Sequence, residues 1–589
     1  MFLEQILKQW VQRLKLIGNN GGNMLELEKL KCVDKPARYI GTEARQVIKN
    51  ITNIKTRVCT LVPMVYEIAS FDMDLKSLYY TLNMRKTTWC ERCFAPMLDF
   101  EMLLKMENEK LFTLESKTPL RNMDVLICIL SNELTYTNML NMLNLGGVPC
   151  LKKRRCEGFP LVIATGEAVL NPCPTKDFVD LYIIGEASLV INEIMDIYEE
   201  AKEKNLTKME LLKNLANVKG VYIPDITDEN KEIHMITQDN LDHEVVPRYL
   251  VKPSITTMFD DTCVSLSCGC SKNCVMCTHK YAYGKPKYVS QEKALMKTHK
   301  LILATGDTSI RLMTNCYGDY PNFEELIYKL RELEKPAVKN ISFMEIKYNK
   351  ENLWLLKYVK DFNEVPSIIV GGATKKLRQK VGIEIEEEDV YNIAYKLFEA
   401  GFNKVRLKFI LGIPGENYED FTKMLEIANK VCKIYKEVYV KSPDKYIVEL
   451  NIYNFIARPH TPSQYAPVNT AENFEIKTRY LIDRNKNENV TIEACEGKQS
   501  VISCMLLRGD NEVSKVVYEA FKLGARHDYM PGIFNIENWQ VALNKCGVEL
   551  KKYLEEINEK LILPWDNIYL KTPKEELRRI YINKIRSSK

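Results

Sequence analysis

Four cysteines lie within ten residues of one another in the stretch CGCSKNCVMC, at Cys268, Cys270, Cys274 and Cys277. Thiols this close together can form a disulfide, bind a zinc ion or hold an iron–sulfur cluster. The 18 cysteines of the 589-residue chain are scattered, and the first residues do not have the pattern of a signal peptide. Small disulfide-stapled secreted proteins differ from this chain in both respects. We therefore expect a cytoplasmic, reducing location and reduced thiols in this stretch.

The spacing Cys270–x3–Cys274–x2–Cys277 favours a cluster over structural zinc. A structural zinc site usually takes four protein ligands in two pairs, and no second CxxC lies nearby. Cys90 and Cys93 of CERC are far away in the chain, and we interpret them as unpaired thiols. Three thiolates on a short loop suit a cubane with one iron left open for a substrate or cofactor. Thiols that are merely buried remain the third interpretation.

Strand and helix patterns alternate on both sides of this loop. TRVCTLVPM, MDVLICIL, PLVIATG and DLYIIGEAS predict buried strands in the N-terminal half, with helical segments between them. Six further strand candidates follow, namely TCVSLS, TSIRLMTN, NISFMEIKY, SIIVGG, KVRLKFILGIPG and YIVELNIYNFI. This alternation predicts an α/β fold with parallel sheets covered by helices. The cysteine loop follows the first of the six strands, at the strand end where such folds place active sites.

We divide the chain into five regions on this basis. They are an N-terminal helical extension (1–54), a Rossmann-like domain (55–205), a polar linker (206–255), a partial barrel (256–469) and a mainly helical C-terminal region (470–589). The opening segment MFLEQILKQWVQRLKLIG has helical spacing, which predicts an amphipathic packing helix. No apolar run reaches 18 residues, so we expect no membrane span. The net charge of +5 does not mark a nucleic-acid binder.

The stretch CSKNCVMC resembles the signature of the radical S-adenosylmethionine (SAM) superfamily. The resemblance implies that Cys270, Cys274 and Cys277 hold a [4Fe–4S] cluster whose fourth iron chelates the amino and carboxylate groups of SAM. An electron then cleaves SAM to methionine and a 5′-deoxyadenosyl radical, which activates an unreactive C–H bond. The cofactor carries this chemistry while the protein orients the reactants and excludes water. Such an enzyme needs a reducing electron donor, such as flavodoxin or ferredoxin.

Further stretches resemble the SAM-binding elements of this superfamily. NCYGDYPNFEEL stands where the turn after the second strand supports the methionyl amino group, and FILGIPGENYEDF resembles the fifth-strand turn that backs the adenine. Gly371 and Gly372 stand where the fourth strand often carries a ribose-binding Glu. FIARPHTPSQ resembles the sixth-strand ending, and we interpret its His460 as structural. The resemblance thus implies these SAM-binding residues: Tyr283, Asn315, Tyr317, Gly318, Asp319, Gly412 and Pro414.

Residues 55–205 resemble the cobalamin-binding-like domain that precedes the barrel in one subgroup of largely uncharacterised radical SAM proteins. MDVLICIL, PLVIATGEAVLNPCP and DFVDLYIIGEAS carry this similarity, which continues through ARYIGTEAR, LLRGDNEV and LPWDNI. The resemblance implies a Rossmann-like, cobalamin-binding-like domain, then a partial (β/α)6 radical SAM barrel and a mainly helical C-terminal region. Whether cobalamin binds stays open, because residues 1–233 contain no His for cobalt and a buttressing domain has the same fold.

Three functions remain open from the sequence. The first is C–H activation by a radical SAM enzyme, with methyl transfer to carbon if cobalamin is bound. The second is cobalamin-independent modification of RNA or protein, such as methylthio insertion, which commonly needs a second cluster; the sequence has no second cysteine trio. The third is a non-catalytic iron–sulfur module. The substrate, whether small molecule, peptide or RNA, is not identified, nor are the roles of Cys263 and Cys268. If the two domains act together, the loops after Leu130, Ala164 and Ile184 should face the cysteine loop across one cavity.

Overall fold

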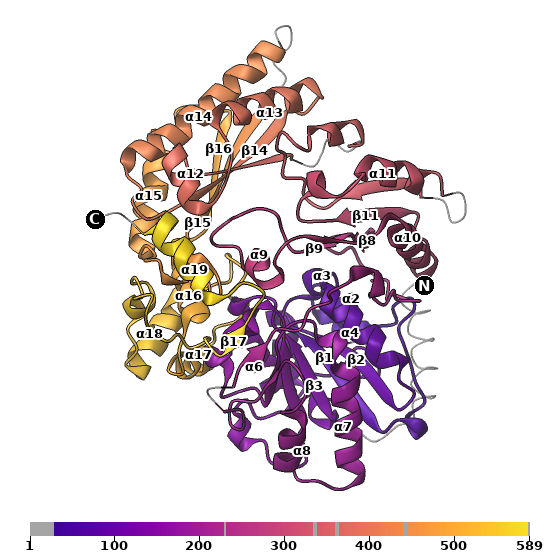
Figure 1. Cartoon of the computed structure of the whole chain (residues 1–589). Helices are drawn as coiled ribbons and strands as arrows, with labels where there is room; N and C mark the ends of the chain where they lie inside the picture. The colour runs from indigo at the N-terminus through magenta and orange to yellow at the C-terminus, as the bar shows by residue number, and fades with distance from the viewer. Residues whose placement is uncertain (1–28, 229–230, 334–337, 360–364, 440–445, 587–589) are drawn as a thin grey trace.

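The computed structural model describes residues 29–228, 231–333, 338–359, 365–439 and 446–586. The amphipathic helix predicted for the first 18 residues lies outside these ranges. Figure 1 shows an N-terminal α/β domain at the bottom and a partial barrel above it, with the last helices along one side of both. The two predicted α/β units are therefore stacked, and the cysteine loop lies in the second one.

A six-stranded sheet forms the N-terminal domain, in the order β2-β1-β3-β4-β5-β6. The first five strands pair in parallel, and β6 is antiparallel to β5. The sequence predicted four of them and missed β2 and β6. The six strands are β1 (Thr56–Val62), β2 (Thr88–Phe94), β3 (Val125–Ile129), β4 (Leu161–Thr165), β5 (Leu181–Ile183) and β6 (Val221–Tyr222).

Helices cover both faces of this sheet, as buried parallel strands require. One face packs against α4 (Met73–Met84), α7 (Ile191–Glu203) and α8 (Lys208–Leu215). The other face packs against α5 (Leu98–Met106) and α6 (Tyr136–Leu145), together with the C-terminal helices α16 (Gly497–Arg508), α17 (Val513–Lys522) and α18 (Ile536–Cys546). The C-terminal region is thus part of the N-terminal core and does not form a separate unit.

The segment 206–255, which we expected to be a polar linker, contains regular secondary structure. Thr207 and Glu210 form a reciprocal capping box that starts α8, because each side chain accepts a hydrogen bond from the other residue's backbone N–H. Three leucines of α8, Leu211, Leu212 and Leu215, are buried against the sheet. Because the segment is mostly polar, the sequence did not predict this short helix, which contributes only one apolar face to the core.

Seven parallel strands build the partial barrel. β8 (Thr262–Ser265), β11 (Ser309–Met313) and β12 (Asn340–Phe343) form one sheet, in the order β12-β11-β8. A second sheet holds β13 (Ser367–Gly371), β14 (Lys404–Leu411), β15 (Ile447–Asn454) and β16 (Val490–Ala494). A parallel bridge between Lys347 and Ser367 joins the two sheets. The six predicted strands are present, and β16 adds a seventh from the region that we expected to be mainly helical.

The helices of the barrel lie on its outside and surround one apolar core. Buried side chains of β8, β11, β13, β14 and β15 fill the interior of that core. The helices are α10 (Gln291–Thr305), α11 (Phe323–Arg331), α12 (Lys375–Val381), α13 (Glu387–Glu399), α14 (Tyr418–Val438) and α15 (Ala471–Arg484).

The C-terminal region ties the two α/β units together. Asn171, in the loop after β4, donates its amide to the carbonyls of Leu507 (2.9 Å) and Gly509 (2.8 Å). Further along, β17 (Ile568–Tyr569) pairs in parallel with β7 (Ile233–His234), and α19 (Lys574–Ile580) follows. This region therefore fixes how the N-terminal sheet sits against the barrel.

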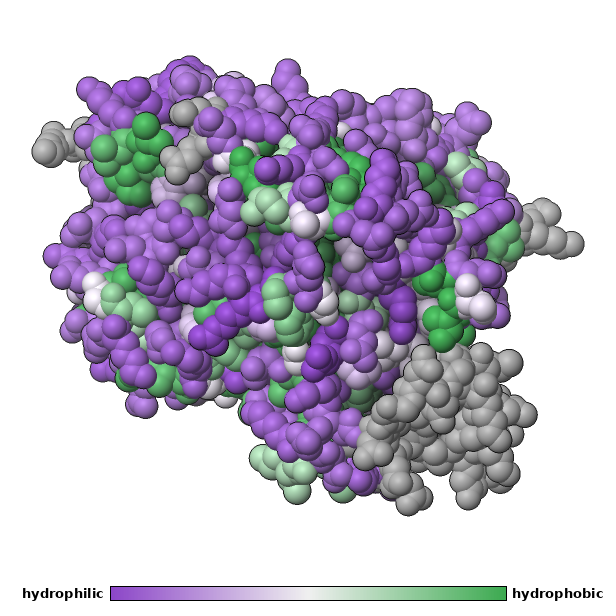
Figure 2. Space-filling view, turned by 90° about the horizontal axis from the view of Figure 1, so that it is seen from below, coloured by the Kyte–Doolittle hydropathy of each residue, from purple (hydrophilic) through white to green (hydrophobic). Residues whose placement is uncertain are grey.

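The surface seen in Figure 2 is mostly hydrophilic, with small separate apolar patches. Within the described ranges, no helix has both the length and the apolar character needed to cross a bilayer.

Candidate functional site

The cysteine loop lies at the carboxyl end of β8, where the sequence placed it. β9 (Ser267–Cys268) continues from β8 and pairs antiparallel with β10 (Lys287–Tyr288). Between β9 and β10 the chain passes through the three predicted ligand cysteines and enters α9 (Thr278–Tyr283). The loop is thus held at its base by a two-stranded sheet and is closed on one side by a helix.

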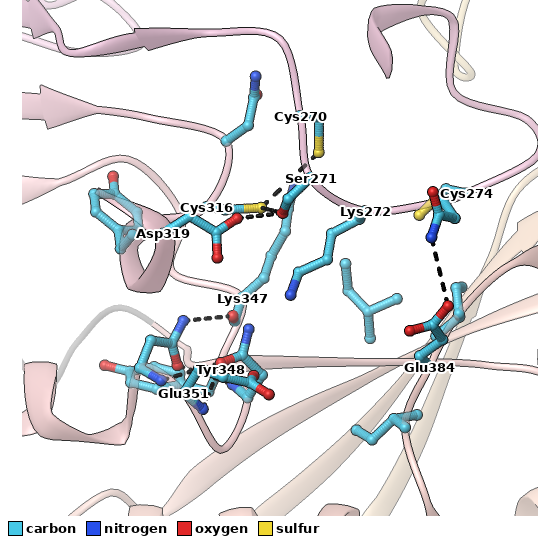
Figure 3. Close-up of a pocket in the computed structure, with 18 of the residues that line it drawn as sticks. Cys270, Ser271, Lys272, Cys274, Cys316, Asp319, Lys347, Tyr348, Glu351 and Glu384 are labelled. Carbon is cyan, nitrogen blue, oxygen red and sulfur yellow. Dashed lines mark hydrogen bonds between the residues drawn. The ribbon is translucent and has the colours of Figure 1, made fainter. Parts of the chain in front are cut away.

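A cavity of about 550 Å³ opens over this loop, and all three predicted ligands, Cys270, Cys274 and Cys277, line it. Figure 3 shows side chains entering the cavity from the loop and from the segments after β11 and β12. Other polar lining residues include Ser271, Lys272, Asn315, Cys316, Asp319, Glu345, Lys347, Glu351 and Glu384. The volume falls within the range of small-molecule sites.

The arrangement of the thiols fits a polynuclear cluster better than one metal ion. In the described part of the chain, no three His, Cys, Asp or Glu side chains converge as ligands of a single ion. Thiolates on one zinc ion, with Zn–S bonds of about 2.3 Å, must lie within roughly 4 Å of one another. A cubane instead spreads its thiolates over separate irons. The three thiols border one open volume and do not converge on a single point, as expected for ligands of a cubane.

Backbone contacts fix the loop from two directions. The Val275 N–H donates to the carbonyl of Val381 at the end of α12 (3.1 Å), and the Ser463 N–H donates to the carbonyl of Val275 (3.2 Å). Gly382, at φ +72°, lies directly against the loop: a Cβ added there would be 1.9 Å from the Asn273 carbonyl oxygen. The loop conformation therefore depends on a glycine more than 100 residues later in the chain.

The helix after the loop is capped by the segment that follows β17. The Thr572 N–H donates to the carbonyl of Tyr281 (3.1 Å), and the Lys571 N–H donates to that of Ala282 (3.4 Å). These carbonyls belong to the last turn of α9, where backbone carbonyls have no hydrogen-bond partners within the helix. At the start of the loop, the Gly269 N–H donates to Nε2 of His279 (3.2 Å). The cysteine loop is thus held by contacts at both of its ends.

The four thiols in this cavity differ in their ease of ionisation. A hydrogen bond from the Cys316 thiol lowers the pKa of Cys270 below its ordinary value. Burial raises the pKa of Cys274 to about 11 and also raises that of Cys277. Burial lowers the pKa of His279, which favours the neutral imidazole. In the metal-free protein, Cys270 is therefore the most readily ionised of the three predicted ligands.

Three of the seven residues predicted to bind SAM line this cavity: Asn315, Tyr317 and Asp319. Asn315 donates its amide to the Gly269 carbonyl (2.9 Å), and Asp319 accepts a hydrogen bond from the Ser271 hydroxyl. Both contacts tie the turn after β11 to the cysteine loop. The Tyr317 hydroxyl donates to backbone carbonyls at the ends of β11 and β12, so its ring is fixed in the core.

The other four predicted residues do not line this cavity. Gly318 lies beside Glu351, and Tyr283 faces the N-terminal domain. Gly412, at φ +88°, donates its N–H to Glu416 (2.7 Å), while the Pro414 carbonyl accepts from Lys380 (2.8 Å). The turn after β14 is therefore built by contacts of its own, and binding of SAM by these residues stays a prediction.

Sequence reasoning missed Cys316, His279 and Lys347. Cys316 stands inside the NCYGD turn that the resemblance had already selected, so its position was available but its thiol was not considered. His279 follows Cys277 by two residues. Lys347 comes after β12, in a segment without a recognisable motif, and only the fold brings it to the cavity. The first two had a signal in the sequence and the third had none.

Two more cavities lie between α9 and the carboxyl edge of the N-terminal sheet. The smaller, about 200 Å³, is lined from the sheet side by Ser131, Gly166, Glu167, Gly185 and Glu186, and from the other side by His279 and Tyr283. The larger, about 760 Å³, includes Asp74, Glu186, Cys268, His279 and Tyr283. His279 lines both of these and the cysteine cavity.

The described residues do not form the single cavity predicted between the N-terminal loops and the three ligand cysteines, because none of these cysteines lines either interdomain cavity. The wall opposite the N-terminal loops is α9, immediately after Cys277, rather than the thiols themselves. Glu133, in the loop after Leu130, turns away from the cavity, because it accepts a hydrogen bond from the Ser503 hydroxyl in α16. Burial raises the pKa of Asp74 to about 7 and raises that of Glu186. The cavity between the domains is therefore polar and rich in carboxyl groups.

Two family models match the chain. The model described as "Radical SAM proteins, N-terminal" matches residues 74–224, which include most of the N-terminal sheet. The model described as "Radical SAM superfamily" matches residues 264–428, which include the cysteine loop and the turn that carries Cys316. The second model includes every described residue that lines the cysteine cavity.

Several individual proteins are similar to the chain. MJ0966, an uncharacterized protein of Methanocaldococcus jannaschii, is 22% identical over 79% of this chain and 91% of its own length. Two tRNA-2-methylthio-N(6)-dimethylallyladenosine synthases are each 25% identical. The one from Lachnoclostridium phytofermentans matches 28% of this chain and 39% of its own length, and the one from Clostridium tetani matches 37% and 47%.

Similar solved structures share little sequence with the chain. One is the radical SAM methyltransferase TsrM of Kitasatospora setae with cobalamin and a [4Fe-4S] cluster bound, with a TM-score of 0.47 at 12% identity, covering 71% of this chain and 78% of that one. Another is the cobalamin-dependent SAM radical enzyme OxsB with aqua-cobalamin bound, with a TM-score of 0.43 at 12% identity, covering 90% and 84%.

Proposed function

The chain belongs to the radical SAM superfamily of enzymes, and on this premise we propose that Cys270, Cys274 and Cys277 hold its [4Fe–4S] cluster. One observation carries the proposal: the three thiols border a single cavity of about 550 Å³ at the carboxyl end of β8, inside the segment that matches the superfamily. With SAM bound, a cluster of this kind supplies the 5′-deoxyadenosyl radical that removes a hydrogen atom from an unreactive C–H bond.

The protein's own part is to orient SAM and keep the reaction shielded from water. The turn after β11 is tied to the cysteine loop by the Asn315 and Ser271 hydrogen bonds, so loop and turn hold a fixed relation to each other. We propose that this turn receives the methionyl end of SAM. The loop itself is locked by Val381 and Ser463. Fixed positioning of this kind converts binding energy into a correctly aimed reaction.

We further propose that the cavities between the domains take cobalamin and that the reaction is methyl transfer to carbon. Ligands of Rossmann-like folds bind at the carboxyl ends of the strands, which is where these cavities lie. The larger one, about 760 Å³, suits a large ligand, and carboxyl groups such as Glu186 would accept hydrogen bonds from its amide groups. Among the described residues two imidazoles line these cavities: His279 lines both, and His243 lines the larger one.

The cobalamin-independent alternative is modification of RNA or protein by methylthio insertion. The names of two partial relatives favour it. Against it, the cysteines of the N-terminal sheet, such as Cys59, Cys90 and Cys128, are free thiols buried in the core, where they do not form an accessible second cluster site. A purely structural iron–sulfur module is disfavoured by the open cavity over the loop. The substrate is left open among small molecules, peptides and RNA.

The test is anaerobic purification followed by iron analysis and an assay for 5′-deoxyadenosine with a strong reductant. We expect about four irons per chain. Cys274→Ala should lose most of the iron, whereas Cys268→Ala, which removes a thiol outside the cysteine cavity, should keep it. Stoichiometric zinc, or 5′-deoxyadenosine formation that survives loss of any one of the three thiols, would overturn the proposal. Titration with hydroxocobalamin, followed by its absorbance, tests the second cofactor separately.

A further inference from the structure

A fourth thiol stands at the cysteine cavity. The sulfur of Cys316 lies 3.9 Å from the sulfur of Cys270, and the Ser271 hydroxyl donates to Cys316 at the same distance. Figure 3 shows Cys316 pointing from the turn after β11 toward Cys270 and Ser271 on the facing loop. Cys316 and the three predicted ligands are the four cysteines among the described residues that line this cavity.

Cys316 does not have the surroundings of a packing residue. The packing thiols of this chain, such as Cys59 and Cys128, are fully buried inside strands. Cys316 is only half-buried, faces the cavity and has the polar side chains of Ser271 and Asp319 beside it. Its backbone is held in place on both sides, because Asn315 is bonded to the cysteine loop and Tyr317 to the barrel core.

We propose that the Cys316 thiolate binds the open iron of the cluster while SAM is absent, and that SAM displaces it. The proposal rests on the proposed function, since it needs the cluster on the three loop cysteines. A [4Fe–4S] cluster is commonly completed by four thiolates, and thiolate is a strong ligand for iron in such clusters. Three come from the loop, and Cys316 is the fourth thiol already in contact with one of them.

The position of Cys316 makes it a direct competitor of SAM. Its turn, from Asn315 to Asp319, is the one that the resemblance assigns to the methionyl amino group. The same iron would therefore have two alternative ligand sets: the thiolate of Cys316, or the amino and carboxylate groups of SAM. The exchange breaks one iron–sulfur bond and forms one iron–nitrogen and one iron–oxygen bond, without a change in oxidation state.

The exchange also has a definite proton balance. Free SAM carries an ammonium group near neutral pH and must lose one proton to bind iron through nitrogen. Cys316, once displaced, takes up one proton to become a thiol. The displaced Cys316 thiolate can therefore take up the proton that SAM loses, and the exchange balances without another acid or base.

The experiment compares the native protein with Cys316→Ala and Cys316→Ser, all reconstituted anaerobically. The matched control is Cys546→Ala, because Cys546 is also a half-buried thiol but lines none of the three cavities described. We expect the electron paramagnetic resonance spectrum of the reduced cluster to differ between the native protein and Cys316→Ala before SAM is added, and to become the same after it. At pH 7, Cys316→Ala should bind SAM at least tenfold more tightly. Cys546→Ala should match the native protein in both measurements.

Two outcomes separate this inference from the proposed function. Native protein without about four irons per chain would overturn both. A native protein with a full cluster, whose spectrum and SAM affinity are unchanged in Cys316→Ala, would overturn the role of Cys316 alone. If Cys316→Ala folds poorly, Cys316→Ser keeps a group that accepts from Ser271 while weakening the iron ligand, and a native-like spectrum in that variant would overturn the role equally.

Discussion

Replacing Gly382 by Ala should displace the cysteine loop and empty the cluster site. Gly382 caps α12 at φ +72°, and the added Cβ would lie 1.9 Å from the Asn273 carbonyl oxygen, although real Cβ contacts are essentially never shorter than 3.0 Å. The loop backbone must therefore retreat by more than an ångström, next to Cys274. The left-handed conformation alone costs about 1–2 kcal/mol, and loss of the adjacent Val275–Val381 hydrogen bond adds about 1 kcal/mol.

The matched control is Gly547→Ala, because Gly547 also ends a helix in the left-handed region, at φ +66°, with nothing within 4 Å of the added Cβ. It carries the backbone cost without the clash. We expect both variants to lose about 1–3 kcal/mol of unfolding free energy, measured with urea on the metal-free proteins. After anaerobic reconstitution, only Gly382→Ala should have less than half of the native iron and visible absorbance. Native iron content in Gly382→Ala would refute the argument that the loop needs this close approach.

Two further predictions concern buried groups that join the regions of the chain. Burial lowers the pKa of His460 to about 4, from an unfolded value near 6.5. The stability that the neutral imidazole contributes is therefore present above pH 6.5 and is lost as the pH falls through 4. Over this pH range, the unfolding free energy of the native protein, measured with urea, should fall by about 3 kcal/mol more than that of His460→Gln. Asp528→Ala leaves the Thr137 hydroxyl and the Trp539 indole without their buried acceptor. It should lower the unfolding free energy, measured with urea, by about 2–4 kcal/mol. An unchanged unfolding midpoint would show that water replaces the carboxylate.

Strands could be read from the sequence wherever their residues are apolar. β3 (Val125–Ile129) and β4 (Leu161–Thr165) are buried throughout and were predicted. β2 is equally buried but carries Glu91 and Arg92, which broke the pattern. Their charges are balanced by Arg57, Glu43 and Glu115, which come from other parts of the chain. A buried ion pair of this kind cannot be recognised from a local window, because its partners are brought in only by the fold.

The site was predictable to a similar, limited extent. The spacing of Cys270, Cys274 and Cys277 was sufficient to propose the ligands, because ligands on one short loop can be recognised from the local sequence alone. The neighbourhood of Cys316 depends on β8 and β11 pairing in parallel, with Ser265 opposite Met313, so that both strands end at the same edge. Contacts such as Asn273 against Gly382 depend on the closure of the barrel, for which the sequence gives no local signal.

The cap on α9 has a consequence for the order of events during synthesis. Tyr281 and Ala282, directly after the cysteine loop, are bound by the backbone of Lys571 and Thr572. These residues leave the ribosome about 15–60 s later than Cys277, at typical elongation rates of 5–20 residues per second. During that interval the loop is exposed on a nascent chain without the segment that closes it. We therefore expect iron and sulfide delivery only after Lys571 and Thr572 have been synthesised, and ribosome-bound chains halted before Lys571 should stay colourless.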